Sequence, residues 1–100
     1  MAKGYWIVRG DVSDPEAYKA YVAANGAAFR KFGAHFLVRG GKHETVEGAG
    51  RARNVVIEFE DYATALACFR SPEYATARAL RLPAAVIDIV VIEGYDGPQP

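Results

Sequence analysis

Hydrophobic and polar residues follow two kinds of pattern along this chain, one with a period of two residues and one with a period of three to four. A period of two is typical of β-strands, and the longer period is typical of amphipathic helices. The strand-like segments are residues 5–12, 35–40, 53–59 and 84–93, and the helix-like segments are residues 14–32 and 61–82. The predicted order is therefore strand, helix, strand, strand, helix, strand.

The segment 53–59 is the one around which we interpret the others. Its apolar residues occupy both alternating faces, with Val55, Ile57 and Phe59 on one face and Val56 on the other. The segment 84–93 is also apolar on both faces. A strand of this kind has to be covered on both sides. Because the helices suffice for only one face of a sheet, the pattern predicts a partner for the other face.

The first helix has clear boundary signals. Either Asp14 caps the helix with Pro15 at its first position, or Ser13 forms a capping box with Glu16. Both alternatives start the helix at the same place. Gly33 follows the last apolar position of the stripe and is typical of a left-handed helix cap.

The remaining boundaries follow from turn and cap residues. We expect Asp61 to open the second helix, and Ser71 followed by a proline to interrupt it and cap a further helical segment through Leu82. On this helix we expect three side chains to point inward, Tyr62, Leu66 and Phe69. Gly40 and Gly41 are suited to a β-bulge, after which residues 42–47 are expected to continue as a more polar strand.

The order of elements predicts an α+β domain with the βαββαβ ferredoxin-like fold. In this fold four strands form one antiparallel sheet, strand three lies between strands one and two, and the helices cover one face. The opposite face would expose several hundred Å² of apolar surface in a monomer, so we expect a two-fold symmetric homodimer. We expect residues 1–94 to form one domain and residues 95–100 to form a flexible C-terminal tail.

Composition limits the classes of function. Lysine and arginine together equal aspartate and glutamate together, at 12 each, so the formal net charge is zero and argues against nucleic acid or an anionic membrane as a partner. Strand three also lacks the glycine and aromatic stacking signature of RNA-recognition domains. No segment is long and apolar enough to span a membrane, and no export signal is evident, so a cytoplasmic location is expected. The single cysteine, Cys68, excludes an internal disulfide.

Several short motifs resemble a known family in order and spacing. They are GYWI at 4–7, DPEAYKAY at 14–21, FLVRGG at 36–41, EG at 47–48, VIEF at 56–59, SPEY at 71–74 and EG at 93–94. Together they resemble the domain of unknown function 1330 family, which belongs to the dimeric α/β-barrel superfamily. The resemblance implies a barrel formed by two paired sheets, and it implies no established activity. Relatives in the superfamily include cofactor-free monooxygenases, haem-degrading enzymes and isomerases, which is an analogy of fold.

Charged residues within the strands are the first candidates for a site. They are Arg9, Arg39, Arg53, Glu58 and Asp88. Charges on apolar strands must be paired, solvated or directed into a cleft. Arg39 and Glu58 also match motif positions, so Arg39 is a candidate for binding a carboxylate or phosphate and Glu58 is a candidate catalytic base. The alternative is that these charges form structural ion pairs or dimer contacts.

Tyrosines are the second group of candidates. Tyr18, Tyr21 and Tyr74 bring phenolic hydroxyls to the boundary between helix and sheet, where they can line a small aromatic pocket. The alternative is that they pack in the core. With Arg9, Arg39 and Arg53 they complete the predicted ligand-binding set.

Other reactive residue types carry no role at this stage. His35 and His43 are too few to predict a metal site, and Cys68 has no second cysteine or partner base nearby in sequence. Trp6 and Asn25 are residue types that cofactor-free oxygenases of the superfamily use, but no matching motif accompanies them. We expect no cofactor, because no phosphate-binding or other cofactor motif is present, although a motif is not required for a flat organic ligand such as haem.

Two functions are compatible with these observations. One is a homodimer in which each chain binds or transforms a small acidic or aromatic metabolite, using Arg39, Glu58 and the tyrosines. The other is a non-catalytic assembly module in which the in-strand charges only set the dimer register. The substrate and the reaction are not encoded in any motif of this sequence.

Overall fold

The elements follow the predicted order. The computed structural model describes residues 2–100. Its elements are β1 (Gly4–Val12), α1 (Pro15–Lys31), β2 (His35–Arg39), β3 (Arg53–Phe59), α2 (Tyr62–Phe69), α3 (Pro72–Arg81) and β4 (Ala85–Glu93). The second predicted helix is two helices, because a serine and a proline interrupt it at the expected place. The ferredoxin-like βαββαβ fold is confirmed.

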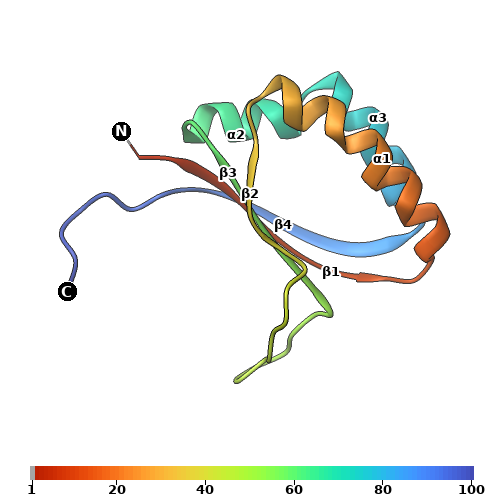
Figure 1. Cartoon of the computed structure of the whole chain (residues 1–100), viewed down its shortest axis with the longest axis horizontal. Coiled ribbons are helices and arrows are strands. Elements are labelled where there is room, and N and C mark those ends of the chain that lie inside the picture. Colours follow the sequence, from red (N-terminus) through yellow and green to blue (C-terminus); the bar gives the residue numbers. More distant parts are fainter. Residues whose placement is uncertain (1) are drawn as a thin grey trace.

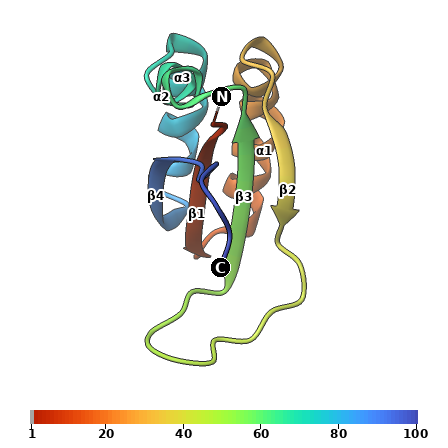
Figure 2. The same cartoon turned by 90° about the vertical axis from the view of Figure 1, so that its left-hand side faces the viewer.

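The four strands form one antiparallel sheet in the order β2-β3-β1-β4. β3 lies between β1 and β2, as predicted. All three helices lie on one side of the sheet, as Figure 1 shows, and Figure 2 shows α1 behind β2 and β3. Among the described residues no helix covers the other side, which we call the outer face.

Local side-chain caps start all three helices. The side chains of Asp14, Asp61 and Ser71 each accept a hydrogen bond from the backbone N–H three residues later, at 3.1, 2.8 and 3.1 Å. Such caps satisfy a backbone donor that the helix itself leaves free. The Ser13 hydroxyl instead donates to the carbonyl of Ala84 at 3.1 Å. The Asp14 cap is therefore the alternative that the chain uses.

The predicted strand at residues 42–47 is wrong. Residues 40–52 form a loop that extends beyond the outer side of the sheet (Figure 1). Gly40, where the chain leaves β2, has a φ of 66°, and within the described residues no strand pairs with the polar residues that follow. The irregularity in the ladder also lies earlier than the expected bulge, between Phe36 and Val38.

The predicted inward position of Tyr62 is also wrong, because its exposure is 39%. The residues of α2 that are fully buried are the small ones, Ala65 and Cys68. A Cβ atom on Gly4 would lie only 2.2 Å from the carbonyl oxygen of Asp61, so the start of α2 lies very close to β1. This close approach leaves room for only small side chains between α2 and the sheet. Tyr62 therefore lies at the edge of α2, partly exposed to solvent.

Trp6 is the centre of the core between helices and sheet. It is fully buried, and its ring centroid lies 5.0–5.7 Å from those of Tyr74, Phe29, Phe59 and Phe69. Its indole N–H donates to the carbonyl of Ala65 at 2.8 Å. The aromatic cluster therefore joins α1, α2 and α3 to the sheet and forms the floor beside which a pocket opens.

Candidate functional site

A pocket lies between α1 and the helix-facing side of the sheet. Its volume is about 360 Å³, including the space at its open mouth. From α1 it is lined by Tyr18, Tyr21, Val22, Asn25 and Phe29. From the strands it is lined by Trp6, Val8, Phe36, Arg39, Arg53, Val55 and Ile57. The lining is mostly apolar and aromatic, with two arginines and one asparagine as its charged or amide groups.

The pocket lining follows from the periods of helix and strand. Each of the five residues from α1 lies three or four positions from another of them, so they share one face of the helix. Arg53 and Val55 lie two positions apart on β3, so both point to the helix side. Arg39 pairs with Val55 across the ladder and shares that face. The structure thus brings Arg39 and Arg53 to the same pocket as the predicted tyrosines of α1.

At the inner end of the pocket, the hydroxyl of Tyr21 is paired with that of Tyr74, which lies behind the lining. The hydroxyls of Tyr21 and Tyr74 are 2.8 Å apart, and either can donate. Burial, and then the neighbouring Tyr74 hydroxyl, raise the pKa of Tyr21 well above its ordinary value. Tyr21 therefore stays protonated at neutral pH. Tyr74 is fully buried and does not line the pocket itself. This corrects the prediction that Tyr74 lines the pocket, because Tyr74 lies behind Tyr21.

The other end of the pocket is basic. The Arg53 guanidinium carbon lies 5.7 Å from the centre of the Tyr18 ring, and that of Arg39 lies 4.2 Å from the centre of the Phe36 ring. Nε of Arg53 is buried and has no hydrogen-bond partner among residues 2–100. Among the described residues no carboxylate forms an ion pair with either arginine. Two guanidinium groups are thus available to an acidic ligand.

Glu58 and Arg9 do not share this pocket, which corrects the expectation that Glu58 acts together with Arg39. Glu58 lies next to Ile57 on β3, and successive side chains of a strand point to opposite faces. It therefore lies on the outer face, where it accepts a hydrogen bond from the Tyr5 hydroxyl at 3.3 Å. Arg9 pairs with Asn54 and Asp88 in the ladders and lies on the outer face too.

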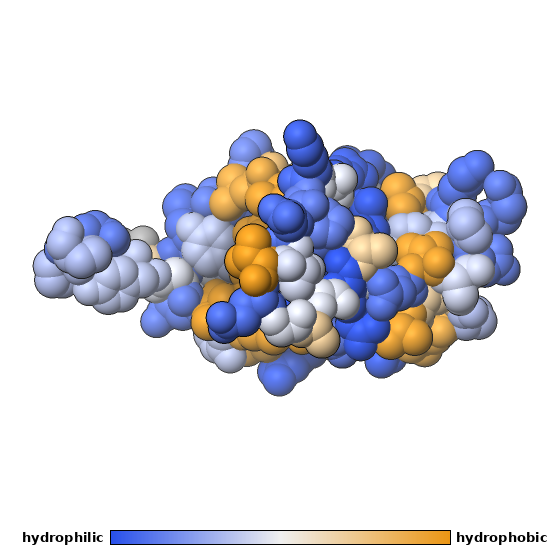
Figure 3. Space-filling model, turned by 90° about the horizontal axis from the view of Figure 1, so that it is seen from below, coloured by the Kyte–Doolittle hydropathy of each residue, from blue (hydrophilic) through white to orange (hydrophobic). Residues whose placement is uncertain are grey.

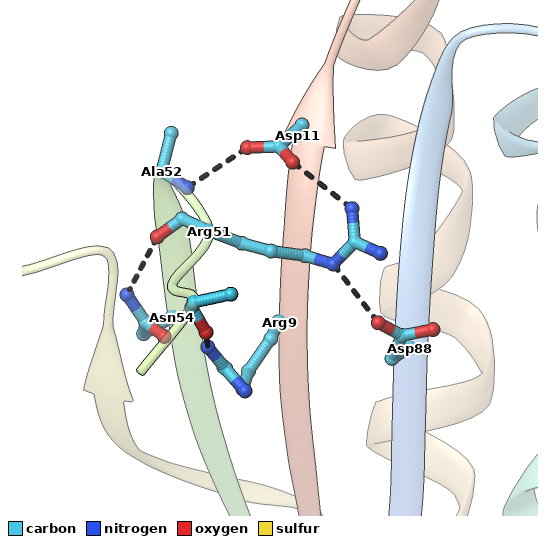
Figure 4. Close-up of polar contacts among 7 residues, drawn as sticks. Arg9, Asp11, Arg51, Ala52, Asn54 and Asp88 are labelled. Atoms are coloured by element: carbon cyan, nitrogen blue, oxygen red, sulfur yellow. Dashed lines mark hydrogen bonds and ion pairs between the residues drawn. The ribbon is translucent and has the colours of Figure 1, made fainter. Parts of the chain in front are cut away.

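A network on the outer face holds the end of the loop at residues 49–52 (Figure 4). Arg51 forms ion pairs with Asp11 at 3.0 Å and with Asp88 at 2.9 Å. The second oxygen of Asp11 accepts the backbone N–H of Ala52 at 2.9 Å, and Arg9 donates to the carbonyl of Ala49 at 3.0 Å. Two of the predicted site residues, Arg9 and Asp88, thus have structural partners.

The rest of the outer face is largely apolar. Val38, Val56, Ile7 and Val90 follow one another across the four strands in a single row of the ladder. We call these four residues the apolar row. Figure 3 shows this side of the molecule with hydrophobic patches among polar ones. Its large exposed side chains include Leu37, Val38, Val86, Val90 and Ile92, which are 42–61% exposed.

Asn25 and Trp6 line the pocket although sequence reasoning gave them no role. Asn25 is a buried polar residue on α1, one turn after Tyr21, at 7% exposure. The signal for Asn25 was its place on the same three- and four-residue stripe as Tyr18 and Tyr21. The position of Trp6 was signalled only by its alternation with Ile7 on the first strand.

The other reactive residue types lie outside the pocket. Cys68 is buried, and burial, with a smaller effect of Glu73, raises the pKa of its thiol to about 12. His35 and His43 are exposed, and among residues 2–100 no three potential metal-binding side chains gather. Within the same residues, no helix combines the length and the apolar composition needed to cross a membrane.

Comparison with a family model supports the resemblance predicted from the motifs. The model described as domain of unknown function (DUF1330) matches residues 3–95. Among curated proteins none matches this sequence.

Solved structures with similar folds share little sequence with this chain. A protein of unknown function from Rhodopseudomonas palustris has a TM-score of 0.72 at 19% identity, covering 96% of this chain and 85% of that one. SnoaB, a cofactor-independent oxygenase from Streptomyces nogalater, has a TM-score of 0.63 at 12% identity, covering 100% and 97%. A dimeric ferredoxin-like protein of unknown function from Thermobifida fusca has a TM-score of 0.59 at 15% identity, covering 92% and 89%. At these identities the likeness shows the fold alone.

Proposed function

Since this chain belongs to the domain of unknown function (DUF1330) family, whose description assigns no activity, we propose from its pocket that it binds a small acidic aromatic metabolite. The observation that carries the proposal is the pair Arg39 and Arg53 at one end of an aromatic pocket, with no carboxylate paired to either among the described residues. A guanidinium group binds a carboxylate through two parallel hydrogen bonds. The ligand's acidic group is therefore placed at the arginines.

The remaining lining suits the rest of such a ligand. Tyr18 and Phe29 offer ring faces and edges, and the Tyr21 hydroxyl offers a polar contact at the inner end. Pockets for small molecules are commonly apolar with a few polar groups that set the orientation. A flat ring between α1 and the sheet, with its acidic group toward Arg53, uses each of these groups.

Binding is better supported than catalysis by these residues. Among the described residues that line the pocket there is no carboxylate, histidine or cysteine, and Tyr21 stays protonated at neutral pH. Glu58, the predicted catalytic candidate, lies on the other face of the sheet. The neighbour named as a cofactor-independent oxygenase illustrates that one fold can carry several chemistries, so any reaction has to be argued from this chain's own pocket.

We further propose that a second copy of the chain covers the outer face. The apolar row and Ile92 would leave this face unusually hydrophobic in a monomer. Across a two-fold axis the same patch of each chain contacts that of the other, so the apolar row of one chain packs on the apolar row of the second. A neighbour of the same fold is described as dimeric, which agrees with this arrangement.

A ligand titration tests the pocket. Benzoate, phenylacetate and salicylate, with the neutral benzamide for comparison, are titrated while the fluorescence of Trp6, the single tryptophan, reports on the pocket. We expect at least one acid to bind and to raise the melting temperature more than benzamide does. Arg53→Met should weaken that binding about tenfold or more, because it removes a charge-assisted hydrogen bond.

Arg70→Met is the matched control, because Arg70 is exposed at the end of α2 and does not line the pocket. Equal binding of acids and benzamide, or equal affinity in the Arg53→Met and Arg70→Met variants, would contradict the proposal.

The alternative function is a non-catalytic assembly module. The observation that favours it is the network of Arg51, Asp11 and Asp88, which uses in-strand charges for structure rather than for a ligand. Under this alternative, Arg51→Ala weakens the dimer while no acid of the panel protects the protein against heat. Protection by an acid that depends on Arg53 decides in favour of the pocket.

A further inference from the structure

A second cavity lies on the helix side of the sheet, between α3 and β4. Its volume is about 670 Å³, including the space open to solvent. Figure 1 shows the C-terminal end of α3 leading back into β4 beside this region. The apolar part of its lining includes Leu82, Ala85, Ile87 and Ile89. Its charged part consists of two arginines, Arg78 and Arg81, and none of the described residues that line it is acidic.

Arg81 is the unusual member of this lining. It is only 5% exposed, and its Nε atom is buried with no hydrogen-bond partner in the described part of the chain. Among residues 2–100 no carboxylate forms an ion pair with it. Its guanidinium carbon lies 5.8 Å from the centre of the Tyr21 ring. A contact of this kind offsets only part of the cost of burying a charge, which an anion would offset more fully.

Arg78 provides a second positive charge at the same cavity. It lies one helical turn before Arg81 on α3, so both side chains leave the helix on one face. Arg78 is exposed, and its guanidinium carbon lies 5.9 Å from the centre of the Phe69 ring. One buried and one exposed arginine thus stand beside a wall of aliphatic side chains from β4.

We propose that this second cavity binds an amphipathic organic anion, with its carboxylate or phosphate head at Arg81 and Arg78 and its apolar body against Ile87 and Ile89. This cavity and the pocket under α1 share no lining residue, although Arg81 contacts Tyr21, and the proposal does not depend on the function proposed for that pocket. The two heads present the same chemistry to a guanidinium group, because both offer paired oxygens. The apolar body is needed because most of the remaining lining is aliphatic.

Three probes of equal chain length test the site, namely octanoate, octyl phosphate and octanol. We expect octanoate or octyl phosphate to bind by isothermal titration calorimetry and to raise the melting temperature, and octanol to do so at least about tenfold more weakly. The tighter of the two anions identifies the kind of head. Binding of octanol as tight as that of both anions, or binding of neither anion, overturns the proposal.

Two variants at the exposed Leu82 locate the binding without disturbing the core. Leu82→Glu places a negative charge at the cavity and should weaken anion binding about tenfold relative to Leu82→Gln, which has a similar size and no charge. Equal anion affinity in the two variants overturns the proposal. Arg81→Met should remove the binding as well, and because Arg81 is buried, its effect is read only in samples shown to be folded.

Comparing Arg53→Met with Leu82→Glu shows which of the two pockets the anion occupies. Arg53→Met should leave octanoate affinity unchanged within about twofold, because Arg53 lines only the pocket under α1. If Arg53→Met removes octanoate binding and Leu82→Glu does not, the anion occupies the pocket under α1, and the second site is rejected while the first is retained. Arg70→Met again controls for a general change in charge.

Discussion

The hydroxyls of Tyr21 and Tyr74 form a buried polar contact beside the candidate pocket. Their 2.8 Å hydrogen bond joins α1 to α3, and Tyr74 is fully buried. A buried hydroxyl that loses its partner costs about 1–3 kcal/mol. We therefore expect Tyr21→Phe to lower the free energy of unfolding by about that amount, because it leaves the Tyr74 hydroxyl without its partner.

A double-mutant cycle provides the check. Urea denaturation of Tyr21→Phe, Tyr74→Phe and the double variant should show that the double variant loses less than the sum of the single losses. Tyr62→Phe, at a tyrosine that is 39% exposed, should change stability little. Strict additivity of the two losses would show that the hydroxyls do not stabilise each other.

Residue roles could be predicted from the sequence where the partner is close along the chain. The caps at Asp14, Asp61 and Ser71 each use a backbone donor three residues away, so the local pattern was sufficient. Arg51 was missed because its partners Asp11 and Asp88 are 40 and 37 residues away. Only the fold brings such groups together.

The loop between β2 and β3 is attached to the sheet partly through Asp11, and this attachment makes stability depend on pH. Hydrogen bonds from the backbone of Ala52 and from Arg51 hold the pKa of Asp11 below its ordinary value of 3.8. A carboxyl group whose pKa is lower in the folded state stabilises the fold above its unfolded-state pKa. That contribution is lost as the pH falls through the lower folded-state pKa.

We expect Asp11→Asn to be less stable than the natural chain at about pH 6, with the difference in free energy of unfolding narrowing as the pH falls below the ordinary carboxyl pKa of 3.8. Urea denaturation across this range measures the change. Asp96→Asn, in the C-terminal tail, is the control, and its free energy of unfolding should equal that of the natural chain at every pH. If the difference in free energy of unfolding between Asp11→Asn and the natural chain stays constant across the range, titration of Asp11 does not contribute to stability.

Element positions were predicted well where hydrophobic periodicity was strong and poorly where it was weak. The wrong strand at residues 42–47 came from a polar segment with no apolar face to bury. The face to which Glu58 points was not decided by the sequence, because β3 is apolar on both sides and alternation alone does not say which side the helices cover. Arg39 was ambiguous for another reason, since the ladder shifts between Phe36 and Val38.

The whole molecule has two different faces, and the apolar row on the outer face is where we expect a second copy to pack. Val90 is 54% exposed in the single chain. Val90→Lys should weaken the dimer about a hundredfold or more, because a two-fold interface would receive the unpaired charge twice. Sedimentation velocity over a range of concentrations measures this loss.

The control for this change also introduces a lysine, but on the helix side of the molecule. Leu80→Lys lies on α3, at a side chain that is 42% exposed, and should leave the assembly unchanged. A Val90→Lys variant that remains as dimeric as Leu80→Lys would place the interface elsewhere.

Native mass spectrometry of the gently purified protein tests the central claim most directly, because it reports assembly and bound ligand together. We predict a dimer that takes up one aromatic acid per chain from the benzoate, phenylacetate and salicylate panel, and that loses this uptake in Arg53→Met but not in Arg70→Met. A monomer would contradict the pairing of the outer faces. A dimer that takes up none of the acids, or takes them up equally in both variants, would contradict the arginine-lined pocket.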